Sequence, residues 1–171
     1  MNNETNGFLE CLYNRALYVG VKHGITVTSG TDSLEIALRA LDVGPGDEVI
    51  TVPFIWWISS AEVIGLVGAT PVFVDIEPDS FNIAVTRIEA VITPRTKAIL
   101  PVSLFGQMPD FGAINAIAAR HRLPVSEGAG LAPWRGFHPA VVSCALDDRA
   151  RPGVLSGAGR MNSFEAVGML R

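Results

Sequence analysis

Short β-branched segments alternate with segments of helical periodicity along most of this chain. Apolar residues at a spacing of two predict strands at residues 25–28, 48–52, 71–75, 97–102 and 123–126. A period of 3.6 predicts helices at residues 32–41, 59–67, 86–92 and 110–121. The connections between these segments are short, and parallel strands need a helix to cross from one to the next. The sequence therefore predicts an α/β fold with a mostly parallel sheet and helices on both faces.

The two ends of the chain follow this alternation less closely than the well-patterned core at residues 23–127. Residues 8–18 carry apolar side chains four positions apart and predict an amphipathic helix within an N-terminal arm, residues 1–22. The tail, residues 128–171, contains several Gly and Pro, with a strand predicted at residues 140–145 and a short helix at residues 162–171. For 171 residues in all, we expect one domain.

The composition is that of a folded protein without a surface for nucleic acid. Apolar residues make up 49% and charged residues 18%, unlike the composition of a disordered segment. The formal net charge is −4 and no Lys/Arg cluster follows one face, which argues against a nucleic-acid partner. Cys11 and Cys144 lack a CxxC or Cys/His spacing, so we expect neither a disulfide framework nor a metal site.

The most apolar window, residues 55–74, does not predict a membrane span. Glu62 and Pro71 interrupt it, and its periodicity changes near Gly68 from that of a helix to that of a strand. The first twenty residues lack the uninterrupted apolar segment of a signal peptide. We therefore expect a cytoplasmic protein with no membrane partner.

A small polar turn, Ser29-Gly30-Thr31, joins the first predicted strand to the first predicted helix, which we expect to begin at Asp32. The first N–H groups of a helix have no partners within the helix and carry the positive end of its dipole, so such a turn can bind a phosphate. Asp32 and Glu35 also fit a capping box, in which case Gly30 only supplies turn geometry. Both interpretations stay open from these residues alone.

An aromatic loop, residues 53–57, follows the second predicted strand. The loop therefore lies at the carboxyl end of that strand, and ligands of parallel α/β sheets bind at this edge. Trp56 and Trp57 lie in this loop, and either ring can stack on a ligand or fill the core beside a helix.

Six stretches of the first 127 residues match one enzyme family in the order in which that family has them. They lie at residues 18–25, 29–41, 43–57, 68–83, 92–107 and 114–127. The chain thereby resembles the DegT-type nucleotide-sugar aminotransferases, which are pyridoxal-phosphate (PLP) enzymes of fold type I. The resemblance covers the amino-terminal half of such an enzyme and implies part of the large domain of a PLP transferase.

The resemblance also implies the residues that bind the cofactor. Gly30 and Thr31 correspond to the residues that hold the cofactor phosphate, in agreement with the argument from the helix start. Trp57 corresponds to the aromatic residue that stacks on the pyridine ring, with Trp56 as the alternative.

Two departures from the family concern the chemistry of the cofactor. The family has a Glu-Asp-Ala-Ala run whose Asp pairs with the protonated pyridine nitrogen, and here Gly128 stands at the Asp position and Leu131 replaces a polar residue. The family then has a Ser-Phe-His/Tyr-Pro-x-Lys run, whose Lys forms the internal aldimine and moves protons on the substrate. Residues 137–139 resemble the start of this run, but Val141 stands at the Lys position.

The sequence offers no credible substitute for these two groups. Its two lysines, Lys22 and Lys97, both precede the segment that bears the Schiff-base lysine in the family. His138 matches the aromatic or His position of the motif and not its Lys position, although some relatives that catalyse dehydration use a histidine. We therefore assign no catalytic residue. Residues 159–166 resemble a helix that the family has much later, so we expect a chain shortened internally and cut at its end.

The resemblance implies transfer of an amino group from glutamate to a keto-sugar nucleotide through PLP, with catalysis impaired by the two missing groups. The alternative is a non-catalytic remnant or binding module that forms a homo-oligomer or pairs with a full-length homologue, because the family's active site lies between two subunits. A dinucleotide-binding domain is a third interpretation, which the absence of a GxGxxG motif disfavours.

Overall fold

The computed structural model describes residues 23–27, 30–53, 59–103, 107–128, 140–145 and 163–168. Its strands are β1 (His23–Val27), β2 (Glu48–Thr51), β3 (Thr70–Phe73), β4 (Thr96–Ile99), β5 (Val125–Gly128), β6 (Ala140–Ala145) and β7 (Ser163–Gly168). Its helices are α2 (Gly30–Ala40), α3 (Ser59–Leu66), α4 (Val85–Ile88) with the 3-10 turn η2 (Glu89–Val91), and α5 (Phe111–His121). The N-terminal arm and its predicted helix lie outside the described residues.

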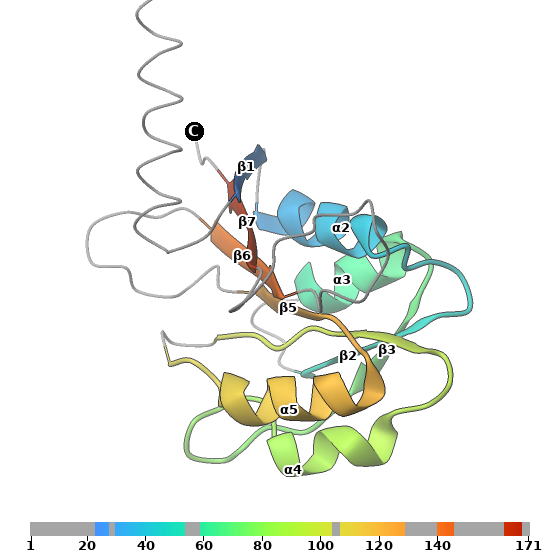
Figure 1. Ribbon diagram of the computed structural model, residues 1–171, viewed down its shortest axis with the longest axis vertical. Coiled ribbons are helices and arrows are strands. Elements are labelled where there is room, and N and C mark those ends of the chain that lie inside the picture. Colours follow the sequence, from blue (N-terminus) through green and yellow to red (C-terminus); the bar gives the residue numbers. More distant parts are fainter. Residues whose placement is uncertain are drawn as a thin grey trace, which may run out of the picture.

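The described strands form one sheet in the order β1-β7-β6-β5-β4-β2-β3. The pairs β2/β3, β2/β4, β4/β5 and β1/β7 are parallel, whereas β6 runs antiparallel to both of its neighbours. The predicted mostly parallel sheet is therefore confirmed, and consecutive strands β2, β3, β4 and β5 are each connected through a helix (Figure 1).

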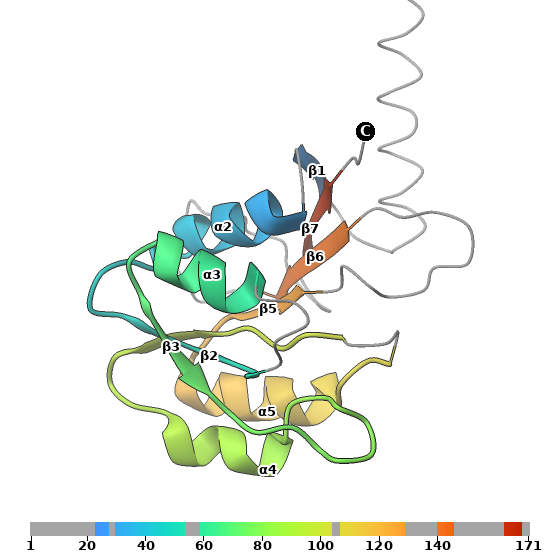
Figure 2. The same cartoon turned by 180° about the vertical axis from the view of Figure 1, so that it is seen from behind.

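Helices cover both faces of this sheet, as predicted. Figures 1 and 2 show α2 and α3 on one side and α4 and α5 on the other. Neighbouring residues of β2 belong to different cores, because successive side chains of a strand point to opposite faces. Val49 packs with Leu38 and Ile64 beneath α2 and α3. Ile50 packs with residues such as Ile114 beneath α5, so that the sheet separates two apolar layers.

The helix predicted at residues 162–171 is wrong, because residues Ser163–Gly168 form strand β7. This strand pairs with β1 from His23↔Phe164 to Val27↔Gly168 and with β6 along its whole length. Two rows of backbone hydrogen bonds outweigh the weak helical preference of a short segment, whose propensity tertiary context routinely overrides. The strand predicted at residues 140–145 is confirmed as β6.

The start and the end of α5 follow from local chemistry. The carboxylate of Asp110 accepts a hydrogen bond from the Ala113 N–H at 3.0 Å, which satisfies one of the N–H groups that the helix leaves unpaired. Arg122 ends the helix with φ 56° and donates its N–H to carbonyls of the last turn. Among the described residues, no helix has the length and apolar character needed to span a bilayer.

We predict that Leu38→Ala lowers the free energy of unfolding by about 2–5 kcal/mol, because Leu38 is fully buried in the core beneath α2. Urea denaturation followed by circular dichroism measures this change. The control on the same helix is Ile36→Ala, whose side chain is 42% exposed and should cost no more than about 0.5 kcal/mol. Equal losses in both variants would contradict the placement of α2 on the sheet.

Candidate functional site

The carboxyl ends of β2, β4 and β5 meet at one edge of the sheet. Ile99 of β4 is the register partner of both Ile50 and Val125, so the three parallel strands end side by side. Beyond β4 the pairing continues to a bridge between Val102 and Gly128. Ligands of open parallel α/β sheets bind at this edge, because the loops and helix starts that follow the strands converge there.

A side-chain hydrogen bond joins the first turns of helices α2 and α3. Helix α2 begins at Gly30, and the Thr31 hydroxyl donates a hydrogen bond to Ser59 Oγ in the first turn of α3 at 3.4 Å. Ser33 Oγ donates to the Gly30 carbonyl at 2.6 Å and fixes the first turn of α2. Two helix starts at one point present several backbone N–H groups and two positive dipole ends to the same region.

Of the two interpretations of this turn, the capping box is wrong. Asp32 lies inside the first turn of α2, whereas a capping residue must precede the helix. Glu35 forms an ion pair with Arg39 at 2.8 Å on the exposed side of the helix. Gly30 and Thr31 thus lie at the helix start where a phosphate would bind, and phosphate binding itself stays a prediction.

Ser60 brings a buried hydroxyl close to Gly128. The serine is 3% exposed, and among the described residues its Oγ has no hydrogen-bond partner. A Cβ built on Gly128 would lie 3.8 Å from Ser60 Oγ and 3.6 Å from a methyl group of Val102, both ordinary contact distances. A Cβ at the position that carries Asp in the enzymes this chain resembles would therefore be in van der Waals contact with its surroundings, beside a hydroxyl with unused hydrogen-bonding capacity.

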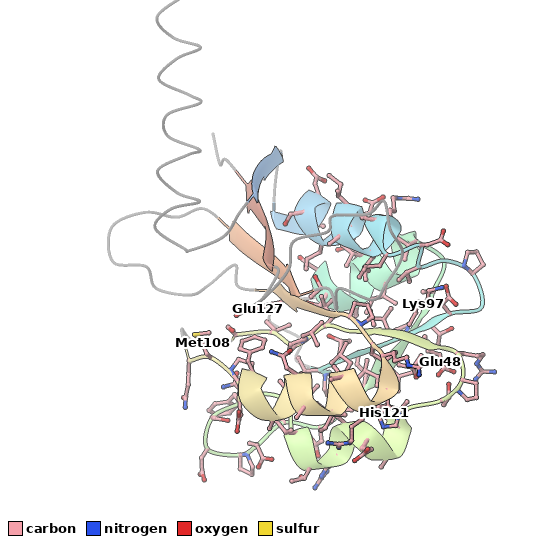
Figure 3. All side chains as sticks on the ribbon, in the orientation of Figure 1. Glu48, Lys97, Met108, His121 and Glu127 are labelled. Atoms are coloured by element: carbon pink, nitrogen blue, oxygen red, sulfur yellow. The ribbon has the colours of Figure 1, made fainter. Side chains whose placement is uncertain are left out.

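Glu127 precedes Gly128 and points to the other face of the sheet. The Ser103 hydroxyl donates to its carboxylate, which ties the end of β5 to the segment after β4. Figure 3 labels Glu127 at the end of β5. Burial raises the pKa of Glu127 above its ordinary value, and the hydrogen bond from Ser103 opposes that shift. Sequence analysis missed this pair, because Ser103 and Glu127 lie 24 positions apart and belong to no motif that we considered.

Neither lysine is placed by the structure at this edge. Lys97 lies in β4 six residues before Ser103, about 20 Å away for a strand that rises about 3.3 Å per residue. Figure 3 shows Lys97 beside Glu48 and well separated from Glu127. Lys22 lies outside the described residues. Val141, at the position of the family's lysine, lies in β6 next to Val142, the register partner of Gly128.

The remaining predicted site residues can be placed only in part. Trp57, Trp56, His138 and Leu131 lie outside the described residues, so stacking on the cofactor ring stays a prediction. Within the part of the chain that the structure describes, no group of three or more His, Cys, Asp or Glu side chains could hold a metal ion.

Comparison with known proteins decides the family. Residues 12–133 match the sequence model of the DegT/DnrJ/EryC1/StrS aminotransferase family. The chain belongs to this family. Its members include solved structures that resemble the present fold at 36–39% sequence identity, in agreement with the part of a PLP-transferase domain that the sequence predicts.

A sugar-nucleotide enzyme of this family, the UDP-2-acetamido-2-deoxy-3-oxo-D-glucuronate aminotransferase of Pseudomonas aeruginosa, is 54% identical over 141 residues. The match covers 79% of this chain and 39% of that enzyme. DesV of S. venezuelae, solved with a ketimine intermediate, has a TM-score of 0.68 at 39% identity and is matched over 74% of this chain and 33% of its own. The PLP form of a sugar aminotransferase, Spr1654 of Streptococcus pneumoniae, has a TM-score of 0.63 at 39% identity. This match covers 66% of the present chain and 29% of Spr1654. The chain thus spans well under half the length of the relatives it matches.

The described residues fit one part of PLP and not another. The joined helix starts, with the Thr31 hydroxyl and the unpartnered Ser60 hydroxyl, suit an anionic group with oxygen acceptors. The covalent and ionic contacts of an aminotransferase do not fit, because Gly128 has no carboxylate and Val141 has no amine. When bound to a lysine, the cofactor acts as an electron sink for the substrate carbon, and this chain lacks the side chains for that attachment.

We predict that Glu127→Gln stabilises the fold at neutral pH. Because the pKa is raised, the carboxyl group lowers the stability of the fold as the pH rises from the ordinary value of 4.5 to the folded-state pKa; the cost is absent below this range and fully present above it. Glutamine keeps a partner for Ser103 and removes the charge. Thermal unfolding as a function of pH should show a gain that is absent near pH 4 and grows as the pH rises.

The matched control is Glu48→Gln at the opposite end of the sheet. Hydrogen bonds from Thr93 and Arg95 lower the pKa of Glu48, so its charge stabilises the fold above pH 4.5 and this contribution is lost as the pH falls. The two variants should therefore shift the melting temperature in opposite directions at pH 7. A loss of stability in Glu127→Gln at pH 7 would refute the assigned burial of that carboxylate.

Proposed function

We propose that this chain is a catalytically impaired member of the sugar aminotransferases that binds PLP without a covalent bond. The parent reaction is transfer of an amino group from glutamate to a keto-sugar nucleotide. The observation that carries the proposal is the hydrogen bond between Thr31 and Ser59, which joins the starts of α2 and α3 at the carboxyl edge of the sheet. In this proposal the junction binds the phosphate, with Gly30 as the first residue of α2, and the resemblance assigns the stacking on the ring to Trp57.

Impairment follows from the two groups that the chain lacks. Amine transfer needs a lysine that bonds to the cofactor and moves protons on the substrate carbon. Lys97 is the second residue of β4 and precedes Val102, the bridge partner of Gly128, by five residues, which is about 16 Å in an extended chain and longer than a lysine side chain. Without a carboxylate at Gly128, no fixed negative charge stabilises a protonated ring nitrogen.

The second candidate is a non-catalytic module that pairs with a second copy or with a full-length homologue. Large apolar side chains on the described surface favour it, since Leu66 is 57% exposed and Phe73, on the outermost strand β3, is 48% exposed. Such side chains at a sheet edge are typical of surfaces that another chain covers. This candidate needs no bound cofactor.

Borohydride reduction separates the two candidates. The purified chain is incubated with PLP, reduced, and analysed by intact mass, while unreduced samples are assayed for PLP binding by equilibrium dialysis. We expect PLP to bind, no aldimine absorbance in the visible range, and no stable adduct at Lys22 or Lys97. A stoichiometric adduct at one of them would refute non-covalent binding, and absence of any bound PLP would favour the pairing module.

We predict that Thr31→Ala weakens PLP binding by about tenfold and leaves pyridoxal binding unchanged, because the hydroxyl that donates to Ser59 can rotate to donate to a phosphate oxygen, which pyridoxal lacks. Equilibrium dialysis with both compounds measures the two affinities. Thr86→Ala is the matched control, since Thr86 is an exposed threonine of α4 on the other side of the sheet. Equal weakening for PLP and pyridoxal would contradict a phosphate-binding role.

A further inference from the structure

We propose that strand β7, near the end of the chain, is a positioning element of the candidate site, because it attaches β1 and the turn before α2 to the sheet. This inference rests on the proposed binding of a phosphate at that turn. In the order of the sheet, β1 is the outermost strand, and β7 is its only neighbour among the described strands. The two strands pair in parallel from His23↔Phe164 to Val27↔Gly168. An N-terminal strand is thus bound to the sheet through a C-terminal one.

The register brings the end of β7 to the start of the candidate site. Because the two strands are parallel and aligned, Gly168 lies level with Val27, the last residue of β1. Gly30, the first residue of α2, follows Val27 by three positions. Helix α2 also lies against β7 and β6 (Figure 1). The first turn of α2 therefore depends on β7 both through direct packing and through β1.

The side-chain contacts at the start of α2 are a weaker attachment than this pairing. The Thr31 hydroxyl donates to Ser59 Oγ at 3.4 Å, which is long for a hydrogen bond between two hydroxyl groups. Ser33 Oγ bonds to the Gly30 carbonyl within the same turn, so it stabilises the turn without attaching it to the sheet. A single long hydrogen bond holds less firmly than a ladder of backbone bonds along a whole strand.

Separation of β7 from the sheet would leave the two apolar layers in place. Among the described side chains, those that form these layers lie between residues 34 and 125. Strand β1 precedes that range and β7 follows it. Proteins open locally in contiguous cooperative units, at free energies below that of global unfolding. We therefore expect β1 and β7 to open as one unit before β2, β4 and β5 do, and to release the start of α2 with them.

Native-state hydrogen exchange of the unmodified chain tests this unit without a ligand. We expect the paired amides of β1 and β7 to share one opening free energy at each urea concentration, below that of the amides in β2, β4 and β5. Protection of β1 after β7 has exchanged would overturn the inference, because β1 has no other neighbour among the described strands. Opening of the two strands only together with the whole core would overturn it as well.

The variant Ala166→Pro tests the effect on the site. Ala166 is the register partner of both Ile25 and Val142, and proline removes a backbone N–H from a strand that has neighbours on both sides. We expect β1 to lose protection while β4 keeps it, and PLP to bind at least about tenfold more weakly, because less than about a tenth of the molecules would have an ordered turn. The control, Ala166→Ser, keeps the N–H and should retain the native affinity.

Pyridoxal, which lacks the phosphate, distinguishes positioning of the turn from a general loss of structure. We expect Ala166→Pro to bind pyridoxal as the native chain does. Equal weakening for PLP and pyridoxal, or an unchanged PLP affinity with β1 unprotected, would overturn the positioning role and leave the proposed function intact. If Ala166→Pro does not fold, exchange in the native chain decides. Failure of the native chain to bind PLP would overturn the proposed function, and the exchange measurement would still decide whether β7 holds β1.

Discussion

The parallel register of β2, β4 and β5 is the constraint on which the rest of the structure depends. Because Ile50, Ile99 and Val125 are aligned across three strands, their carboxyl ends reach the same edge. Apolar layers on both faces hold this alignment, since a slip by one residue would exchange the side chains of the two layers. Val49 packs beneath α3 and its neighbour Ile50 beneath α5, so a register shifted by one residue would place each side chain in the wrong core. The candidate site is a consequence of that alignment.

The site divides into a part made by backbone and hydroxyl groups and a part that needs specific charged side chains. The first part comes from the fold, because helix starts supply N–H groups whatever the neighbouring residues are, and Thr31, Ser59 and Ser60 add hydroxyls. The second part depends on single side chains at positions 128 and 141, and those are Gly128 and Val141. The two parts of the site therefore depend on different features of the sequence, the first on the fold and the second on two individual side chains.

Much of the fold could be predicted from sequence, because periodicity reports which residues meet the two cores. Each strand and helix predicted within residues 25–121 is present with shifted boundaries. The short β7 could not be predicted, since its pairing partners β1 and β6 are remote in sequence. The place of Gly30 and Thr31 at a helix start could be predicted because a strand-turn-helix pattern is a local signal, and their phosphate binding stays a prediction. Ser60 and the Ser103–Glu127 pair were missed because tertiary packing alone brings them to Gly128.

Glu127 and Ser60 bring two polar groups to the carboxyl edge of the sheet beside Gly128. A buried carboxylate with a raised pKa and a hydroxyl without a partner both cost stability, and apolar side chains of similar size would avoid that cost. A ligand with acceptor atoms would satisfy the Ser60 hydroxyl, and its binding free energy would offset the cost of the unpaired group. The same edge thus combines a cost in stability with unused hydrogen-bonding capacity.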